Sequence, residues 1–273
     1  MKWQDRISNN FRYYVEGNLS YNQNEIKEKM EAPQSYDWLY QKGHRIGSRL
    51  IRQFWGLYDS KTSNDRYKAQ YGEDLPTHSV VLKDGDAVYV DLNHDGVIDN
   101  NDYSYAIGHT DDPEYTAGLN MGFQWKRFEF GMRWTAAWNV SRMLDECFRQ
   151  PLGDQQEKAL LQYQFDNVWT PDNPDPNAKY PRATKLNASN NYAASTLYEV
   201  DAKYLRLKSA QIAYHFDFPW MHQIKMTDMT LQLSGYNLLT FSPFKWGDPE
   251  SRTSSRPNYP LTRSFAATLK LGF

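Results

Sequence analysis

The sequence lacks the features on which many stabilising or binding frameworks depend. A single cysteine, Cys147, excludes a disulfide within the chain and a cysteine-based zinc site. No stretch approaches the about 18 consecutive apolar residues of a transmembrane helix. The sequence also has no large excess of charge of either sign, because its 31 Lys and Arg residues nearly balance its 33 Asp and Glu residues. With no positive excess to attract phosphates, we expect no nucleic-acid partner.

Catalytic motifs are missing too. The sequence contains no GxSxG, HExxH, CxxC or glycine-rich phosphate loop, and no two of its six histidines have the i,i+2 or i,i+4 spacing of metal ligands. Paired carboxylates for sugar hydrolysis stay open, since their separation is spatial and cannot be read from sequence. We therefore expect that the protein is not an enzyme, and we assign it no catalytic residues.

Aromatic residues are abundant, with 9 Trp, 20 Tyr and 13 Phe making 15 % of the chain. Residues 115–138, YTAGLNMGFQWKRFEFGMRWTAAW, place large apolar side chains at every second position on two arms of about eleven residues. Lys126 and Arg127 interrupt the alternation between the arms. A period of two on both sides of a short break predicts a β-hairpin with one apolar and one polar face.

Alternating patterns predict about seven long strands in all. Beside the two hairpin arms, they are expected within residues 11–21, 45–58, 203–216, 229–239 and 265–273, of which 45–58 has the weakest pattern. Most reach the 9–11 residues with which a tilted strand crosses a bilayer, whereas strands of soluble sandwiches are usually shorter.

The expected connections alternate in length. Residues 59–114, 139–202 and 240–263 are long, whereas 126–127 and 217–228 are shorter. Such alternation is typical of an outer-membrane barrel, with turns in the periplasm and long loops outside. Residues 22–44 break the rule, because their place in the order predicts a short turn. A soluble calcium-stabilised β-sandwich that binds glycans through aromatic rings is the alternative.

Residues 91–102, DLNHDGVIDNND, match the spacing of a twelve-residue calcium loop, with Gly96 at the sharp bend. The expected oxygen ligands are Asp91, Asn93, Asp95, the Val97 carbonyl, Asp99 and Asp102. The loop departs from the usual form because position 12 is Asp rather than Glu and because a strand-like segment precedes it. We expect a structural Ca²⁺ here; an acidic turn without an ion is the alternative.

Several blocks of the sequence resemble the C-terminal part of SusC/RagA-family TonB-dependent outer-membrane transporters. They occur in the family's order and span nearly the whole chain. The blocks are FRYYVEGNLSYNQNEI (11–26), the calcium-like loop and aromatic hairpin of 85–130, VDAKYLRLKSAQIAYHF (200–216), SGYNLLTFSPFKWGDPE (234–250) and YPLTRSFAATLKLGF (259–273).

The resemblance implies that the chain, residues 1–273, is the C-terminal segment of a 22-stranded barrel in the outer membrane of a Gram-negative bacterium, without the plug domain. It implies import of glycans or peptides, energy from TonB through the missing N-terminal part, outer-membrane lipid around the strands, and a SusD-like surface lipoprotein as partner. It also implies that Phe273 is the terminal residue recognised by the barrel-assembly machinery. The cargo-binding residues are unknown.

Overall fold

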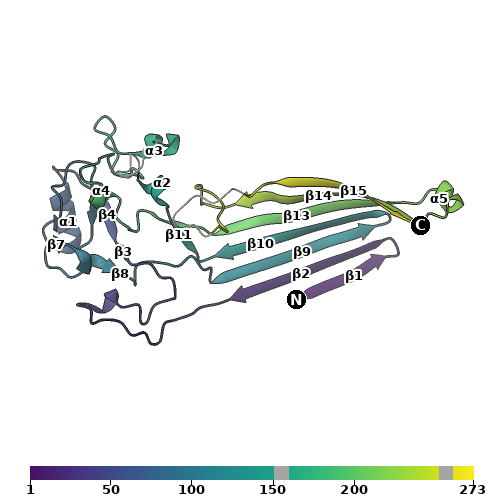
Figure 1. Cartoon of the computed structure of the whole chain (residues 1–273), viewed down its shortest axis with the longest axis horizontal. Coiled ribbons are helices and arrows are strands. Elements are labelled where there is room, and N and C mark those ends of the chain that lie inside the picture. Colours follow the sequence, from purple (N-terminus) through teal and green to yellow (C-terminus); the bar gives the residue numbers. More distant parts are fainter. Residues whose placement is uncertain (151–159, 252–260) are drawn as a thin grey trace.

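The computed structural model describes residues 1–150, 160–251 and 261–273. Its main feature is one open seven-stranded antiparallel sheet in the order β1-β2-β9-β10-β13-β14-β15 (Figure 1). The strands are β1 (Lys2–Ser8), β2 (Phe11–Tyr21), β9 (Tyr115–Trp125), β10 (Phe128–Trp138), β13 (Tyr204–Phe216), β14 (Asp228–Phe241) and β15 (Ser264–Gly272). The expected all-β fold with about seven long strands is confirmed.

The predicted hairpin has a regular register. It pairs Trp125 with Phe128 at the turn and Tyr115 with Trp138 at the far end, without a bulge. Lys126 adopts φ 54°, the left-handed conformation that a two-residue hairpin turn requires at its first position. The two arms therefore present their alternating side chains to the same two faces.

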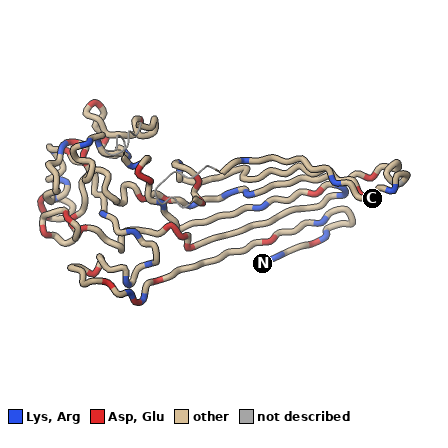
Figure 2. The backbone as a smooth tube through the Cα atoms, in the orientation of Figure 1, with Lys and Arg blue, Asp and Glu red and all other residues tan. Residues whose placement is uncertain are grey.

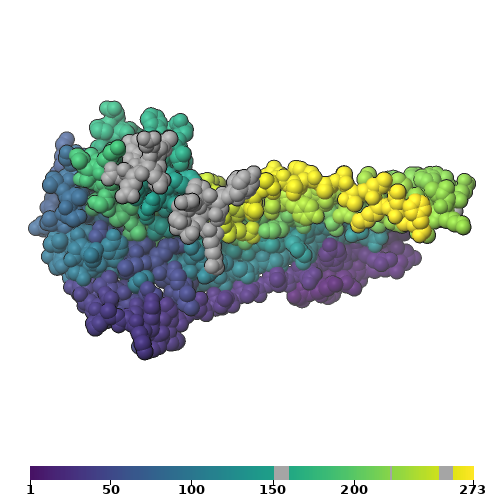
Figure 3. Space-filling model, viewed as in Figure 1, coloured from purple at the N-terminus to yellow at the C-terminus, as the bar shows by residue number. Residues whose placement is uncertain are grey.

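A globular cap, formed by residues 22–114 and the described part of 139–203, lies at one end of the sheet. The short turns and the C-terminus lie at the opposite end, which we name the turn end (Figures 1 and 3). The elements of the cap are short. They are η1 (Asp37–Leu39), β3 (Ile51–Arg52), β4 (Phe54–Leu57), α1 (Ser63–Tyr71), β5 (Thr77–His78), β6 (Ala87–Tyr89), β7 (Val97–Ile98), η2 (Asn100–Asp102), β8 (Tyr103–Ser104), β11 (Ser141–Met143), α2 (Glu146–Arg149), α3 (Gln162–Asn167), α4 (Ala188–Asn191) and β12 (Glu199–Asp201).

The prediction of a long strand over residues 45–58 is wrong. This segment supplies only β3 and β4, which pair with cap strands β8 and β6. Ile51 and Leu57 are 1 % and 3 % exposed, so these two apolar side chains are buried inside the cap rather than along the sheet. Burial in a local core has overridden a weak period-two pattern.

The seventh strand of the sheet is instead β1, which sequence analysis missed. The order of connections then becomes regular, because residues 22–114 form one long connection between β2 and β9. Residues 22–44 are thus part of a cap segment, and the exception in the loop pattern disappears. The β13–β14 connection at the turn end contains α5 (Pro219–Gln223).

Candidate functional site

The polar face of the sheet combines the side chains that alternate with the aromatic positions. Arg133 Nε donates to Asn120 Oδ1 at 2.9 Å, and Gln232 Nε2 donates to Gln211 Oε1 at 3.0 Å. The register pairs Glu129 with Gln124 across the hairpin. The polar face that the alternation predicted for the hairpin is therefore confirmed, and it carries Asn120, Gln124, Glu129 and Arg133.

The opposite face is apolar and aromatic. Phe123 and Phe130 are cross-strand partners with ring centroids 5.4 Å apart, and the rings of Tyr115 and Trp138 stack at 5.2 Å. Many of these side chains have no covering element and remain exposed. They include Phe123, Trp125, Phe128, Ile212, Leu231, Leu233, Phe265, Leu269 and Leu271. We name this surface the aromatic face. A sheet surface that faces water presents mainly polar side chains, whereas this one presents mainly apolar ones.

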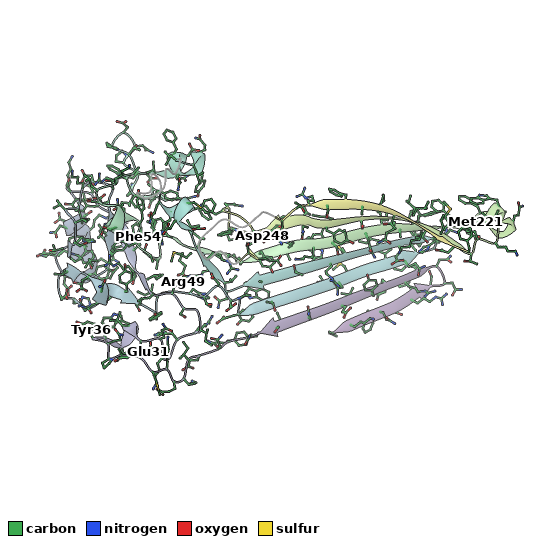
Figure 4. All side chains as sticks on the ribbon, in the orientation of Figure 1. Glu31, Tyr36, Arg49, Phe54, Met221 and Asp248 are labelled. Carbon is green, nitrogen blue, oxygen red and sulfur yellow. The ribbon has the colours of Figure 1, made fainter. Side chains whose placement is uncertain are left out.

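A cluster of arginine–carboxylate pairs joins the cap to the sheet. Arg49 lies at this junction (Figure 4), where its guanidinium pairs with Glu199 and Asp111 and donates to Ser141 Oγ at 2.7 Å. Arg45 pairs with Glu114, one residue before β9 begins. These charges are partly buried and paired, although Arg45 Nη1 is buried without a hydrogen-bond partner, and the pairs hold the cap segments at the strand ends.

A second pair anchors the β14–β15 connection. Arg206 of β13 is 2 % exposed, and its Nη2 donates to both oxygens of Asp248 at 2.8 and 2.7 Å. Its other terminal nitrogen bonds to Glu250. Asp248 lies beside the outer ends of the strands in Figure 4. The Asp-Pro-Glu block quoted above thus holds this connection against β13 by bidentate charge-assisted hydrogen bonds.

The centre of the cap is a buried carboxylate. Asp86 is fully buried and accepts from Arg182 Nε at 2.6 Å, Asn187 Nδ2 at 2.6 Å and Asn191 Nδ2 at 2.9 Å. Every partner in this set comes from the second cap segment, 139–203. The buried charge is compensated, and its network links the two cap segments.

A buried histidine lies near this network. The Tyr89 N–H donates to His78 Nε2 at 3.3 Å, and His78 Nδ1 lies 3.1 Å from the Pro76 carbonyl. Both contacts are satisfied when the neutral ring carries its proton on Nδ1. Burial lowers the pKa of His78 to about 4. Burial also raises the pKa of Tyr180 to about 12, so both rings are neutral near pH 7.

A polar cavity of about 600 Å³ opens between two parts of the first cap segment, residues 23–48 and residues 105–109. The side chains that give it its chemistry are Glu25, Lys27, His44, Arg45, Tyr105 and His109. Sequence analysis identified none of them as a site, because they come from separate loops and have no common spacing. The cavity is thus formed within the first cap segment, where residues 23–48 lie against residues 105–109.

The predicted calcium loop folds as a tight acidic turn. Asp91 is buried, and its carboxylate accepts from the His94 and Gly96 N–H groups at 2.8 and 2.7 Å. His94 and Gly96 have φ values of 60° and 81°, which produce the expected bend. Asp102 is also buried and accepts from the Leu92 and Asp99 N–H groups. Burial raises the pKa of Asp102.

The other predicted ligands lie further out. Asp95 and Asp99 are exposed, and both use carboxylate oxygens for N–H groups of their own turns. Asn93 Nδ2 donates to Asp95. Within the described ranges, no three His, Cys, Asp or Glu side chains gather closely enough to hold a metal ion. The residue types and the bend fit a calcium loop, while backbone donors occupy the carboxylates in this conformation. Calcium binding therefore stays a prediction.

The described helices are all short, and none has the length and apolar character needed to cross a membrane. The short and long connections lie at opposite ends of the sheet, as expected. The turn between β9 and β10 and the C-terminus lie at the turn end, and residues 59–114, 139–150 and 160–202 lie at the other end (Figure 1).

Comparison with known proteins finds similarity to TonB-dependent receptors. No protein-family model matches the sequence. The chain is 23 % identical over 248 residues to the TonB-dependent receptor P3 of Formosa agariphila, which covers 86 % of this chain and 23 % of the receptor. It is 28 % identical over 177 residues to the TonB-dependent receptor P26 of the same organism, covering 63 % of the chain and 17 % of that receptor. The chain therefore spans less than a quarter of the length of these relatives.

Solved structures share the fold. The RagAB peptide importer in its open–open state matches the whole chain with a TM-score of 0.73 at 19 % identity, and in its closed–closed state with a TM-score of 0.72 at 19 % identity. In both, the chain covers 28 % of the matched chain. The resemblance to SusC/RagA-family TonB-dependent transporters, inferred from the sequence blocks, is confirmed.

Proposed function

We propose that this chain forms part of the barrel wall of a TonB-dependent outer-membrane transporter of a Gram-negative bacterium. The observation that supports it best is the division of one long-stranded sheet into an exposed aromatic face and a hydrogen-bonded polar face. The aromatic face then contacts lipid, the polar face lines the lumen, and the cap lies outside the cell. This is the alternation expected for barrels that span the outer membrane.

The edges of the sheet support a larger assembly. β1 and β15 each pair with one neighbour in the described sheet, so each leaves one edge of backbone N–H and C=O groups. Hydrocarbon cannot satisfy those groups, and further strands must pair with them in a membrane. We propose that the chain supplies the C-terminal strands of a 22-stranded barrel. The plug and the TonB contact would come from other parts of the transporter, and Phe273 would serve recognition by the barrel-assembly machinery.

The cargo we propose is a peptide or a glycan, taken up with a SusD-like surface lipoprotein. The solved relatives are named as peptide importers, which makes peptides the first class to test. The soluble sandwich is not favoured, because a sandwich needs a second sheet against the aromatic face, and the other sheets of the described chain have two strands each. The similar proteins are receptors and importers, and we propose no catalytic role.

A pair of adjacent substitutions tests the assignment of the two faces. Ile212→Arg places a cation on the aromatic face, where we expect a cost of about 2–4 kcal/mol near the bilayer midplane. Gln211→Arg places the same side chain on the polar face and should be tolerated. The measurement is the fraction of folded, heat-modifiable protein in outer-membrane preparations. Equal loss of folded protein in both variants would contradict the proposal.

For the loop at 91–102, we propose a structural Ca²⁺ held by the six predicted ligands, once Asp95 and Asp99 turn inward. The oxygen-only donor set and the bend at Gly96 support it. Calcium should protect residues 85–108 from protease in the native chain, and Asp91→Ala should abolish that protection. Asp74→Ala, outside the loop, is the control. Absence of any calcium-dependent protection in the native chain would show that the segment is an acidic turn only.

A further inference from the structure

Aromatic rings continue from the aromatic face past the end of the sheet. The row consists of Phe128, Tyr214, Phe216, Phe218 and Trp220. Successive ring centroids lie 4.7, 4.8, 5.5 and 6.0 Å apart. Its last two members belong to residues 217–227, the connection that contains α5 and projects beyond the other turns in Figure 1. We name this connection the α5 turn.

The α5 turn has a defined inside and outside. Met221, labelled in Figure 4, and Met226 are 3 % and 6 % exposed and form its small core. Phe218, Trp220 and Ile224 are 40 %, 46 % and 51 % exposed. An apolar exterior on a turn that already has its own core is not explained by internal packing.

Backbone hydrogen bonds hold the α5 turn in place. The Met226 N–H donates to the Met221 carbonyl, and the Thr227 N–H donates to the Gly272 carbonyl of β15. The exposed rings are therefore displayed from a fixed support that is attached to the sheet at both ends.

Basic side chains lie at the same level. Lys126 Nζ lies 5.7 Å from the Trp125 ring centroid in the neighbouring turn, and Lys225 is exposed on the α5 turn itself. Arg127 pairs with Asp217 at 2.6 Å, which ties the two turns together. Figure 2 shows basic and acidic positions together at the turn end of the sheet. Aromatic rings next to lysine and arginine are the composition of a membrane–water interface.

We propose that the α5 turn is an interfacial anchor that lies in the phospholipid headgroup layer at the turn end. Phe218, Trp220 and Ile224 insert toward the acyl chains, and Lys225 reaches the lipid phosphates. The inference rests on the proposed function, because it extends the lipid-contacting surface from the aromatic face without a break. Phospholipid is the occupant because the row of rings is continuous with that face and because the adjacent cations complement anionic headgroups.

Nitroxide labels at single cysteines test the anchor. Within the complete transporter, this chain carries Cys147→Ser and one new cysteine, and the transporter is reconstituted in vesicles of phosphatidylethanolamine with a minor fraction of phosphatidylglycerol. Trp220→Cys and Ile224→Cys probe the anchor. Gln223→Cys, an exposed polar neighbour, is the matched control. Phe130→Cys on the aromatic face reports on the sheet. Accessibility to oxygen is compared with accessibility to a water-soluble nickel complex.

We expect labels at 220 and 224 to be several-fold less accessible to nickel than the label at 223, and more accessible to oxygen. If the label at 130 lies in lipid while those at 220 and 224 match 223, the anchor is wrong and the proposed function stands. If the label at 130 is open to nickel as well, the lipid assignment of the aromatic face fails. Labels at 220 and 224 that are accessible to nickel in vesicles, but protected from both reagents in native outer membranes, would identify a protein partner and overturn the lipid proposal.

Discussion

The Tyr14 side chain of β2 lies across the Gly122 backbone of β9 on the polar face. A Cβ atom at Gly122 would come within 2.7 Å of the Tyr14 hydroxyl oxygen and 2.4 Å of the Phe130 carbonyl oxygen. The same hydroxyl lies 3.2 Å from the Cβ position of Gly131 on β10. One phenol therefore spans three strands, and it can do so because two glycines leave its path open.

Gly122→Ala should consequently weaken the sheet. The new methyl group meets backbone as well as the Tyr14 ring, and overpacking of this kind costs about 1–3 kcal/mol. Gly17→Ala is the matched control, because its Cβ would meet the Leu119 side chain at an ordinary 3.9 Å. The measurement is the temperature at which the folded form is lost in detergent. Equal stability of the two variants would show that Tyr14 moves aside without cost.

Loss of Arg206 should release the β14–β15 connection. Arg206→Ala leaves Asp248 and Glu250 without their shared cation, and breaking a buried pair by removing one partner costs about 3–5 kcal/mol. Lys203→Ala breaks the exposed pair with Asp201 and should cost less than about 1 kcal/mol. Protease cleavage within residues 242–250 should accelerate only in the first variant. Similar cleavage rates in the two variants would indicate that Phe244 and its apolar contacts, rather than Arg206, hold the connection in place.

The cap should lose stability in mild acid through His78. The unfolded chain binds a proton at His78 near pH 6.5, whereas the buried ring resists protonation until the pH approaches 4. The stability contributed by the neutral ring is complete above pH 6.5 and is lost as the pH falls toward 4, by about 3 kcal/mol.

Hydrogen exchange of the Tyr89 amide, which bonds to His78, measures this loss. Its protection factor should fall by about two orders of magnitude between pH 6.5 and pH 4. His78→Gln should flatten the profile, while His94→Gln, at an exposed position, should retain it. If the protection factor of the His78→Gln variant depends on pH in the same way as that of the native chain, the acid sensitivity comes from another group.

The strands were predictable where their side chains alternate without interruption. The strands at residues 115–125 and 128–138 have the boundaries that the period of two predicted, because each arm has one apolar and one polar face along its whole length. β1 was missed because Asp5 stands among its apolar positions, between Trp3 and Ile7, and interrupts the alternation. Residues 45–58 were misassigned because a strand-like pattern does not reveal whether a sheet or a local core will bury it.

The candidate site was less predictable. Spacing identified the acidic turn at 91–102, including the bend at Gly96, since its contacts are local in sequence. The pairs of Arg49 with Glu199 and of Arg206 with Asp248 join segments far apart in the chain, and no spacing rule connects them. The cavity near His44 and His109 is equally a product of loop packing.

The cap is built from two segments with the β9–β10 hairpin between them in the chain. Asp86 reaches its partners Arg182 and Asn191 over sequence separations of 96 and 105 residues. These contacts carry a large loop-closure entropy until the hairpin brings the two segments to the same end of the sheet. We therefore expect the hairpin to form first from local contacts and the cap to close afterwards. With the orientation proposed above, the outward-facing cap would then be the last part of the chain to become compact during biogenesis.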